Sequence, residues 1–216
     1  MTARKSGISA ETPLSTPERI LRSAEQLFSA RGIDGVSLRE ITSNAGVNSA
    51  SAHYHFGSKN AVLEALFTLR ARPIIERREE MLTQLKLDRY GRPVLEDVLR
   101  AFLQPALDLL NSPDGATFTL LRARMVLERG DDKLKVMTRT FDRTNVKTLK
   151  MLAKALPKLP QKDLYWRFHF LLATMVYTMA QPGRIESVTK GQIKTSDTES
   201  ALAQLIRFAA AGFRAA

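Results

Sequence analysis

Apolar residues recur every three or four positions along most of this chain, and this repeat restricts the fold more than any other feature. Such spacing places apolar side chains on one face of an α-helix. After residue 90 the repeat runs through residues 92–110, 116–129, 132–156, 162–180 and 198–215. No segment alternates β-branched and polar residues between turns, as a half-buried strand would. The sequence therefore predicts an all-α protein of about nine helices.

Residues 16–45 carry start and stop signals for two helices. Thr16 can cap a first helix, and Pro17 fits within its first turn. The sequence "ARGIDG" then ends this helix. In "SLRE", Ser37 and Glu40 form a capping box, because the serine oxygen accepts from the backbone three residues on while the glutamate reaches back. A second, short helix is predicted from there to residue 45.

A third short helix follows the turn "NAGVN". Gly46 supplies a left-handed stop, Val47 an apolar contact and Asn48 a cap for the new helix. Gly57 ends the third helix, and Ser58 caps a fourth. Two helices joined by such a turn are typical of a helix-turn-helix, whose second helix enters the major groove of DNA.

Prolines and loops mark the remaining boundaries. Pro73 is predicted to break or kink the fourth helix, and Pro105 to kink the helix of residues 92–110, because proline lacks the N–H donor. Residues 181–197 are predicted to form a mobile loop, and residues 1–15 a flexible basic tail.

The third helix is built for close approach to DNA. Its cap and first four residues are small: Asn48, Ser49, Ala50, Ser51 and Ala52. The helix can therefore sit deep in a major groove, where Asn48, Ser49 and Ser51 offer donors and acceptors to base edges. The flat polar side chains that follow are those of His53, Tyr54 and His55. Lys59 begins the fourth helix, where a cation and free backbone donors could together hold a phosphate.

Metal binding and catalysis are the alternatives for this stretch. His53 and His55 are two residues apart and point to different faces of a helix, so they form a poor metal pair. Ser49 and Ser51 lie near histidine, but a docking face of small residues explains them without nucleophilic chemistry. No paired carboxylates and no phosphate loop stand out. The sequence predicts neither an enzyme nor a bound cofactor or metal.

The net charge of +11 suggests a polyanionic partner such as nucleic acid. Most of the excess lies late in the chain, since residues 131–216 hold fifteen Lys and Arg against seven Asp and Glu. Part of it forms a stripe at helical spacing: Arg139, Arg143, Lys147, Lys150 and Lys154. We interpret this stripe as a solvated helix face, with an electrostatic role as the alternative.

Composition also bears on the compartment. The chain has no cysteine, which excludes disulfides and thiolate metal sites and fits a reducing cytosol. The first 18 residues contain no apolar segment of signal-peptide length. The apolar run at residues 168–180 is too short to span a bilayer. The sequence predicts a cytoplasmic protein without a membrane partner.

Residues 16–67 resemble the DNA-binding head of the tetracycline-repressor (TetR) family of bacterial transcription regulators. The motifs are the "F…G" of residues 28–32, "SLREIT", the "AGV" of residues 45–47, and "HYHFGSK". The resemblance implies contacts to bases or nearby backbone from Arg39, Ser49, Ala50, Ser51, His53 and Tyr54. It implies phosphate contacts from His55 and Lys59. Two positions depart from the pattern, because His53 stands where the family usually has tyrosine and Asn60 where it usually has an acidic residue.

The resemblance further implies a helical body that dimerises through its last two helices as a four-helix bundle. Residues 163–180 agree independently, because apolar side chains cover every side of that helix and would need a partner as well as the chain's own core. The predicted interface residues are Trp166, Phe170, Met175, Ala209 and Phe213. The small residues 209–212 would allow a neighbouring helix to approach closely. The alternative is a core formed wholly within one chain.

A small-molecule effector is the last implication of the resemblance. We predict an apolar or amphipathic effector with one polar or acidic end, since long, flexible and aromatic side chains cluster in the body beside Arg122 and Arg124. The candidate ligand-binding residues are Phe102, Phe118, Leu121, Arg122, Met125 and Met175. "LYWRFHFLL" and "RARPIIERREEML" loosely resemble the fatty-acid-responsive subgroup, which suggests an acyl-type effector. The alternative is a body packed solid.

Together these features predict a homodimeric repressor with two parts. Residues 16–60 would form a helix-turn-helix domain that binds a palindromic double-stranded operator. Residues 61–216 would bind the effector and form the dimer. The alternatives are a helical DNA-binding architectural protein that senses no ligand and, from another class, a helical hydrolase.

Overall fold

The computed structural model describes residues 14–112, 115–128, 130–180 and 183–215. Over these residues the chain forms ten α-helices and one 3-10 turn and contains no strand, which confirms the all-α prediction. Two chain segments lie close together at an isolated bridge between Leu87 and Pro93. The predicted flexible tail lies outside the described residues, apart from Leu14 and Ser15.

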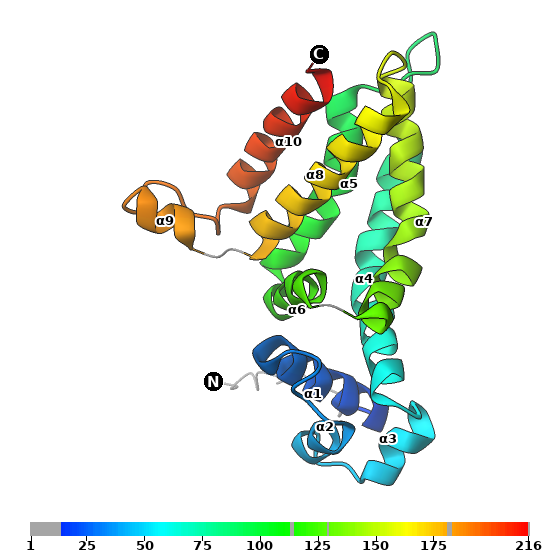
Figure 1. Ribbon diagram of the computed structural model, residues 1–216, viewed down its shortest axis with the longest axis vertical. Helices are drawn as coiled ribbons and strands as arrows, with labels where there is room; N and C mark the ends of the chain where they lie inside the picture. The colour runs from blue at the N-terminus through cyan, green and yellow to red at the C-terminus, as the bar shows by residue number, and fades with distance from the viewer. Residues whose placement is uncertain (1–13, 113–114, 129, 181–182, 216) are drawn as a thin grey trace, which may run out of the picture.

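Three helices form the N-terminal head, at the bottom of Figure 1. They are α1 (Thr16–Arg31), α2 (Leu38–Asn44) and α3 (Ser49–His55). The cap of α1 is Ser15 and not Thr16, because the Glu18 carboxylate accepts from the Ser15 backbone N–H at 2.8 Å and from its hydroxyl at 2.7 Å. Thr16 is therefore the first helical residue.

The predicted caps of α2 and α3 and the turn between them are confirmed, while α2 ends one residue earlier than predicted, at Asn44. Ser37 and Glu40 form the capping box of α2. Gly46 has a φ of 62°, a left-handed conformation that disfavours side chains, and it follows the C-cap of α2 in the turn before α3. The Asn48 side chain accepts from the Ala50 N–H at 3.0 Å and caps α3.

Helix α4 (Lys59–Thr83) runs from the head into the body (Figure 1) and continues through Pro73 without a break. Of the predicted break or kink, the break is therefore wrong. Pro73 and Leu69 are both exposed, so water can serve the Leu69 carbonyl that proline cannot pair with. Pro105 also lies inside a helix, α5 (Leu95–Asp108). Since α4 begins at Lys59, a boundary at residue 60 falls inside its first turn.

The rest of the body packs around α4 and α5. Its remaining elements are the 3-10 turn η1 (Leu109–Asn111), α6 (Gly115–Leu127), α7 (Asp131–Ala155), α8 (Gln161–Ala180), α9 (Arg184–Val188) and α10 (Thr198–Arg214). Helix α4 packs against α5 and α7, α5 against α10, and α8 against α6 and α10. Helix α6 lies directly above α1, so the body rests on the head (Figure 1).

Of the loop predicted at residues 181–197, the structure describes residues 183–197, and residues 181–182 lie outside the described part of the chain. Residues 183–197 contain α9, and the Glu186 carboxylate accepts from the Thr195 backbone N–H at 2.6 Å and from its hydroxyl at 2.5 Å. This contact closes the loop on itself, and α9 is the helix that the sequence prediction omitted. None of the helices in the described part of the chain is long and apolar enough to cross a membrane.

Candidate functional site

Helix α3 lies at the end of the head farthest from the C-terminal helix (Figure 1). Most of its predicted DNA-binding residues are exposed, namely Asn48, Ser49, Ala50, His53, Tyr54 and His55, and so is Arg39 of α2. The Tyr54 side chain is 87% exposed. Ser51 is half-buried, and Ala52 is fully buried against the head core. The helix thus presents a face of small and polar side chains and is anchored by its other face.

A residue that the sequence reasoning missed holds the turn before α3. The Arg19 guanidinium of α1 donates to the carbonyl oxygens of Ala45 and Gly46, at 2.6 and 2.9 Å. These carbonyls belong to the turn that joins α2 to α3. Arg19 therefore fixes the angle at which α3 leaves the head. Its place in the chain gives no sign of this, because an exposed arginine on an amphipathic helix is normally solvated.

A second contact joins the same helices beneath the surface. The buried Ser23 hydroxyl donates to the Ile41 carbonyl at 2.7 Å, and the Asn44 side-chain amide donates to the Ser23 oxygen at 3.0 Å. Each polar group has a partner, so this small network costs no unsatisfied donor in the core. It aligns α1 with α2 and, through the turn, with α3.

The ammonium of Lys59 points into the head. It donates to the carbonyl oxygens of Ile33 and Val36, at 3.0 and 2.9 Å. Two of its three protons are therefore used to tie α4 to the loop before α2, which the sequence reasoning did not foresee. A phosphate contact would have to use the third proton. His53 also contacts the turn that follows α3, because its Nδ1 lies 3.1 Å from the Gly57 carbonyl oxygen.

The head and the body are joined by polar contacts at the α1–α6 junction. Arg124 of α6 donates to the Ala30 carbonyl in the last turn of α1, at 3.2 Å. Lys133 of α7 forms ion pairs with Asp34 at 2.5 Å and with Glu128 at 3.1 Å. The hydrogen bond from Lys133 lowers the pKa of the Asp34 carboxyl from its ordinary value. Arg124 thus contacts the head, unlike Arg122, which lies in the body core.

The six predicted ligand-binding residues lie in the interior of the body. Phe102, Phe118, Leu121, Arg122, Met125 and Met175 are all buried. The Arg122 guanidinium lies 4.5 Å from the centroid of the Phe141 ring. Burial lowers the pKa of Arg122 to about 10. The sequence reasoning missed a second buried cation, Arg78 of α4, whose guanidinium lies 4.2 Å from the centroid of the Phe102 ring.

The predicted interface residues divide into two groups. Trp166 and Phe170 are 55% and 58% exposed, and their rings stack with centroids 5.9 Å apart. Met175 is fully buried within the chain, whereas Ala209 and Phe213 are little exposed but line a groove between α8 and α10. Helical periodicity located the apolar helices but could not show which face of each helix packs against the chain's own core.

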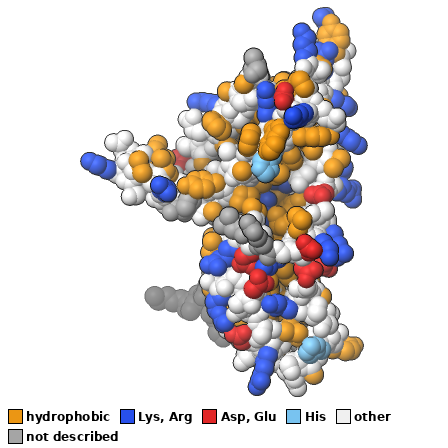
Figure 2. Space-filling model, in the orientation of Figure 1, with side chains coloured by type: hydrophobic (Ala, Val, Ile, Leu, Met, Phe, Trp, Pro, Cys, Tyr) orange, Lys and Arg blue, Asp and Glu red, His pale blue; other side chains and the backbone are white. Residues whose placement is uncertain are grey.

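Exposed aromatic residues mark the outer face of the last long helices. Besides Trp166 and Phe170, these include Tyr177 of α8 and Phe208 of α10. Figure 2 shows hydrophobic side chains gathered over α8. A largely apolar groove of about 380 Å³ separates α8 from α10 and includes Phe170, Phe208 and Gly212 in its lining. Such an exposed apolar patch is typical of a protein contact surface.

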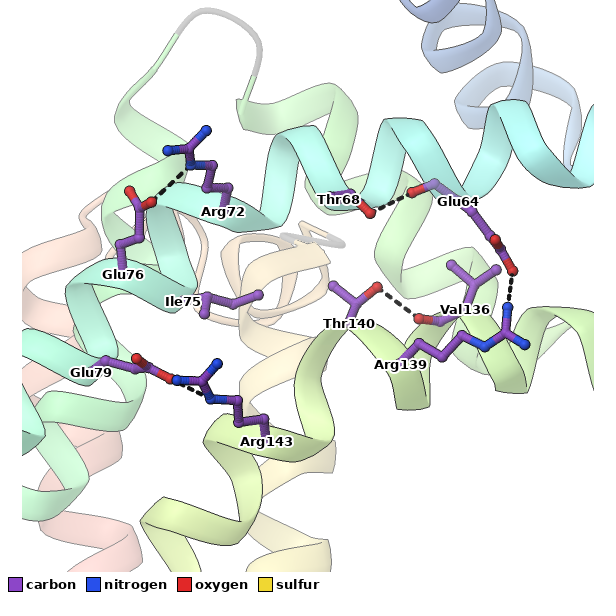
Figure 3. A pocket seen from close by; sticks show the side chains of 10 residues that line it. All are labelled: Glu64, Thr68, Arg72, Ile75, Glu76, Glu79, Val136, Arg139, Thr140 and Arg143. Carbon is purple, nitrogen blue, oxygen red and sulfur yellow. Dashed lines mark hydrogen bonds and ion pairs between the residues drawn. The ribbon is translucent and has the colours of Figure 1, made fainter. Parts of the chain in front are cut away.

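Two residues of the basic stripe of α7, Arg139 and Arg143, line a groove of about 420 Å³ beside α4 (Figure 3). Arg139 pairs with Glu64 at 2.6 Å, and Arg143 and Lys147 pair with Glu79 at 3.3 and 2.9 Å. Hydrogen bonding from Lys147, with the charges of Lys147 and Arg143, lowers the pKa of the Glu79 carboxyl. The stripe is therefore partly an interhelical ion-pair network and not only a solvated face.

Comparison with known proteins agrees with this architecture. The family model described as "Bacterial regulatory proteins, tetR family" matches residues 20–66, and "Tetracyclin repressor-like, C-terminal domain" matches residues 100–212. The HTH-type transcriptional regulator SrpR of Pseudomonas putida is 30% identical over 117 residues, which are 54% of this chain and 48% of SrpR. The chain thus spans about half the length of that relative.

Solved structures share the fold at low sequence identity. The TetR family transcriptional regulator PfmR of Thermus thermophilus has a TM-score of 0.62 at 16% identity, covering 94% of this chain and 98% of PfmR. The fatty acid degradation regulator FadR of Bacillus halodurans has a TM-score of 0.60 at 14% identity, covering 95% of this chain and all of FadR. The matched family models and relatives describe transcriptional regulators and not enzymes.

Proposed function

Since this chain belongs to the TetR family of bacterial transcriptional regulators, we propose that it is a homodimeric repressor whose hold on a palindromic operator is released by a small apolar effector. The observation that carries the DNA-binding part is the exposed face of α3. Small side chains there allow the helix backbone to approach base edges, and Ser49 and Tyr54 project from it. Arg19 keeps that face at a fixed angle.

Dimerisation is proposed from the exposed aromatic residues of α8 and α10. A second copy of the chain that covers Trp166, Phe170, Tyr177 and Phe208 would remove an apolar surface from water. Two heads could then reach successive major grooves on one side of a duplex, roughly 34 Å or a little more apart. This geometry requires an operator with two-fold symmetry.

Effector release is proposed to pass through α6. This helix carries Arg122 in the body core and Arg124 at the Ala30 carbonyl of the head, two residues apart. A ligand that displaced α6 would therefore shift α1 and α3 as well. The apolar core of the body supports an acyl-type effector, and FadR, which shares the fold, is a fatty acid degradation regulator. To act as an inducer, the ligand must bind the released conformation more tightly.

Fluorescence anisotropy with a labelled duplex from the DNA upstream of the chain's own coding region tests the proposal. We expect the parent to bind, and Ser49→Asp to lose binding, because a carboxylate on α3 would face the negative groove. An acidic residue is favourable in the first turn of a helix, so the variant should fold. The matched control is Ser187→Asp, on the exposed α9, which should bind like the parent. Equal binding by Ser49→Asp and the parent would show that α3 is not the DNA-binding element. A duplex affinity that no small molecule alters would favour the architectural alternative.

A further inference from the structure

We infer that Arg78 and Arg122 form a buried anion site in the body and that the effector is an organic carboxylate with an apolar tail, whose head group binds these two guanidinium groups. The inference rests on the proposed function, because it names the chemistry of the effector. It identifies the head group and assigns a role to Arg78, which belongs to the charged sequence "ERREEM".

Both guanidinium groups are buried in the body interior. Arg78 of α4 is 1% exposed and Arg122 of α6 is 4% exposed. They are close enough that the charge of Arg122, together with the larger effect of burial, holds the pKa of Arg78 well below its ordinary value. Two like charges in an apolar interior are unfavourable unless an anion neutralises them.

No carboxylate of the described chain supplies that neutralisation. The one buried acidic residue over the described ranges is Glu25, which pairs with Arg70 at the head. The ion pairs found in this part of the chain include neither Arg78 nor Arg122. The body interior therefore holds two cations without a counter-charge among the residues that the structure describes.

Apart from one backbone hydrogen bond at Arg78, the hydrogen-bond partners of the two guanidinium groups are weak. Arg78 donates from Nε to the Phe102 carbonyl at 2.8 Å, but its Nη2 meets only the Met175 sulfur, at 3.5 Å. Nη1 of Arg122 lies 3.8 Å from the Met179 sulfur, and its Nε is buried without a hydrogen-bond partner. Thioether sulfur is a weak acceptor, so these donors are available to a better one.

A third polar group lies on the same side of α6. The Thr119 hydroxyl, one turn before Arg122, is buried and has no hydrogen-bond partner. A carboxylate could accept from both guanidinium groups and from this hydroxyl, and each such bond would be charge-assisted. Three polar groups with unused hydrogen-bonding capacity would then be satisfied by one ligand group.

The surroundings favour an apolar tail. Phe102, Phe118 and Leu121 are fully buried and add no polar group that would oppose it. Met175 and Met179 occupy the space beside the guanidinium groups. Because methionine is unbranched and flexible, these two side chains can turn aside to admit a ligand. An entering carboxylate would therefore replace two weak sulfur contacts.

Titration calorimetry of the full chain with sodium alkanoates from octanoate to hexadecanoate, each below its micellar concentration, tests the inference. The matched ligands are the methyl esters of the same acids, which keep the tail and lack the charge. We expect alkanoates to bind at least ten-fold more tightly than their esters. Equal affinity of acid and ester, or no binding by any alkanoate, would overturn the inference, and neither result needs a variant.

Two variants then test whether Arg78 and Arg122 bind the carboxylate of the ligand. Arg78→Met and Arg122→Met should each weaken alkanoate binding at least ten-fold and leave ester binding unchanged. Both should also raise the thermal midpoint of the ligand-free chain, because a buried unneutralised charge is replaced by an apolar side chain. Unchanged alkanoate affinity in both folded variants would contradict the assignment. Duplex binding by the same preparations distinguishes failure of this inference from failure of the proposed function. A parent that binds duplex but no alkanoate overturns only this inference. A parent that binds no duplex overturns the proposed function.

Discussion

The ammonium of Lys59 lies 2.9 Å from the carbonyl oxygen of Val36 and so ties the first turn of α4 to the loop that precedes α2. Lys59→Ala should therefore destabilise the head by about 1–2 kcal/mol, since two carbonyl acceptors lose a charged donor. Thermal unfolding followed by circular dichroism measures this loss. Arg39→Ala is the comparison, because Arg39 is exposed on α2.

In DNA binding, the Arg39 variant should lose a phosphate contact that the Lys59 variant keeps. Arg39→Ala should melt like the parent and lower the slope of log affinity against log salt by about 0.9, the effect of one lost phosphate contact. If Lys59→Ala melts like the parent and shows that same loss of slope, its ammonium binds phosphate and not the head carbonyls.

A second prediction concerns how the stability of the head depends on pH through Glu40. Hydrogen bonds from the Ser37 hydroxyl and backbone N–H, then from Arg31, lower the pKa of Glu40 from 4.5 to about 2. A carboxyl whose pKa is lower in the folded state stabilises it above the unfolded pKa, and this contribution is lost as the pH falls towards 2. Glu40→Gln should therefore melt below the parent at pH 6, and the gap should narrow by pH 3. The control is Glu76→Gln, an exposed glutamate outside the capping box. A gap that stays constant with pH would show that Glu40 contributes nothing through its charge.

A third prediction concerns the aromatic face of α8. Phe170→Asp should give folded monomers, because it places a charge on an exposed apolar surface. Leu134→Asp, on the equally exposed side of α7, should leave the oligomeric state unchanged. Met175→Asp should instead unfold the body, since that side chain is fully buried. Sedimentation velocity distinguishes these results, and a monomeric parent at micromolar concentration would contradict the proposed interface.

A fourth prediction concerns Pro73, which lies within α4 on an exposed face. Pro73→Ala should raise the free energy of unfolding by about 1–3 kcal/mol, because the helix gains a backbone hydrogen bond and loses a ring clash. Denaturant titration measures the change. A loss of stability would mean that the surrounding packing requires the shape that proline gives to α4.

Local signals in the sequence were sufficient for most of the head. The capping box at Ser37 and the left-handed Gly46 act within a few residues, so their effects can be predicted without knowing the fold. The same reasoning failed at Pro73, where exposure offsets the missing donor and the helix continues. A proline in the sequence shows that a backbone hydrogen bond is missing, but only the fold shows whether the carbonyl left unpaired is exposed to water.

The body was harder to predict because its features depend on which way each helix turns. Residues 163–180 are apolar on all sides, and periodicity alone could not show that Met175 faces the core while Phe170 faces water. Arg78 lies among charged residues that resemble a solvated face, yet it is buried. Likewise, nothing near Arg19 in the sequence shows that it meets the carbonyls of the turn before α3.

The central claim is that the chain binds a two-fold operator through α3. Selection from a pool of random-sequence duplexes, with the bound fraction recovered and sequenced over several rounds, tests it most directly. We expect the parent to enrich an inverted repeat whose half-site centres lie about one helical turn or a little more apart. Ser49→Ala should enrich a repeat with the same spacing and an altered half-site. Recovery of no common sequence, of an unrepeated site, or of the same half-site by both proteins would contradict the claim.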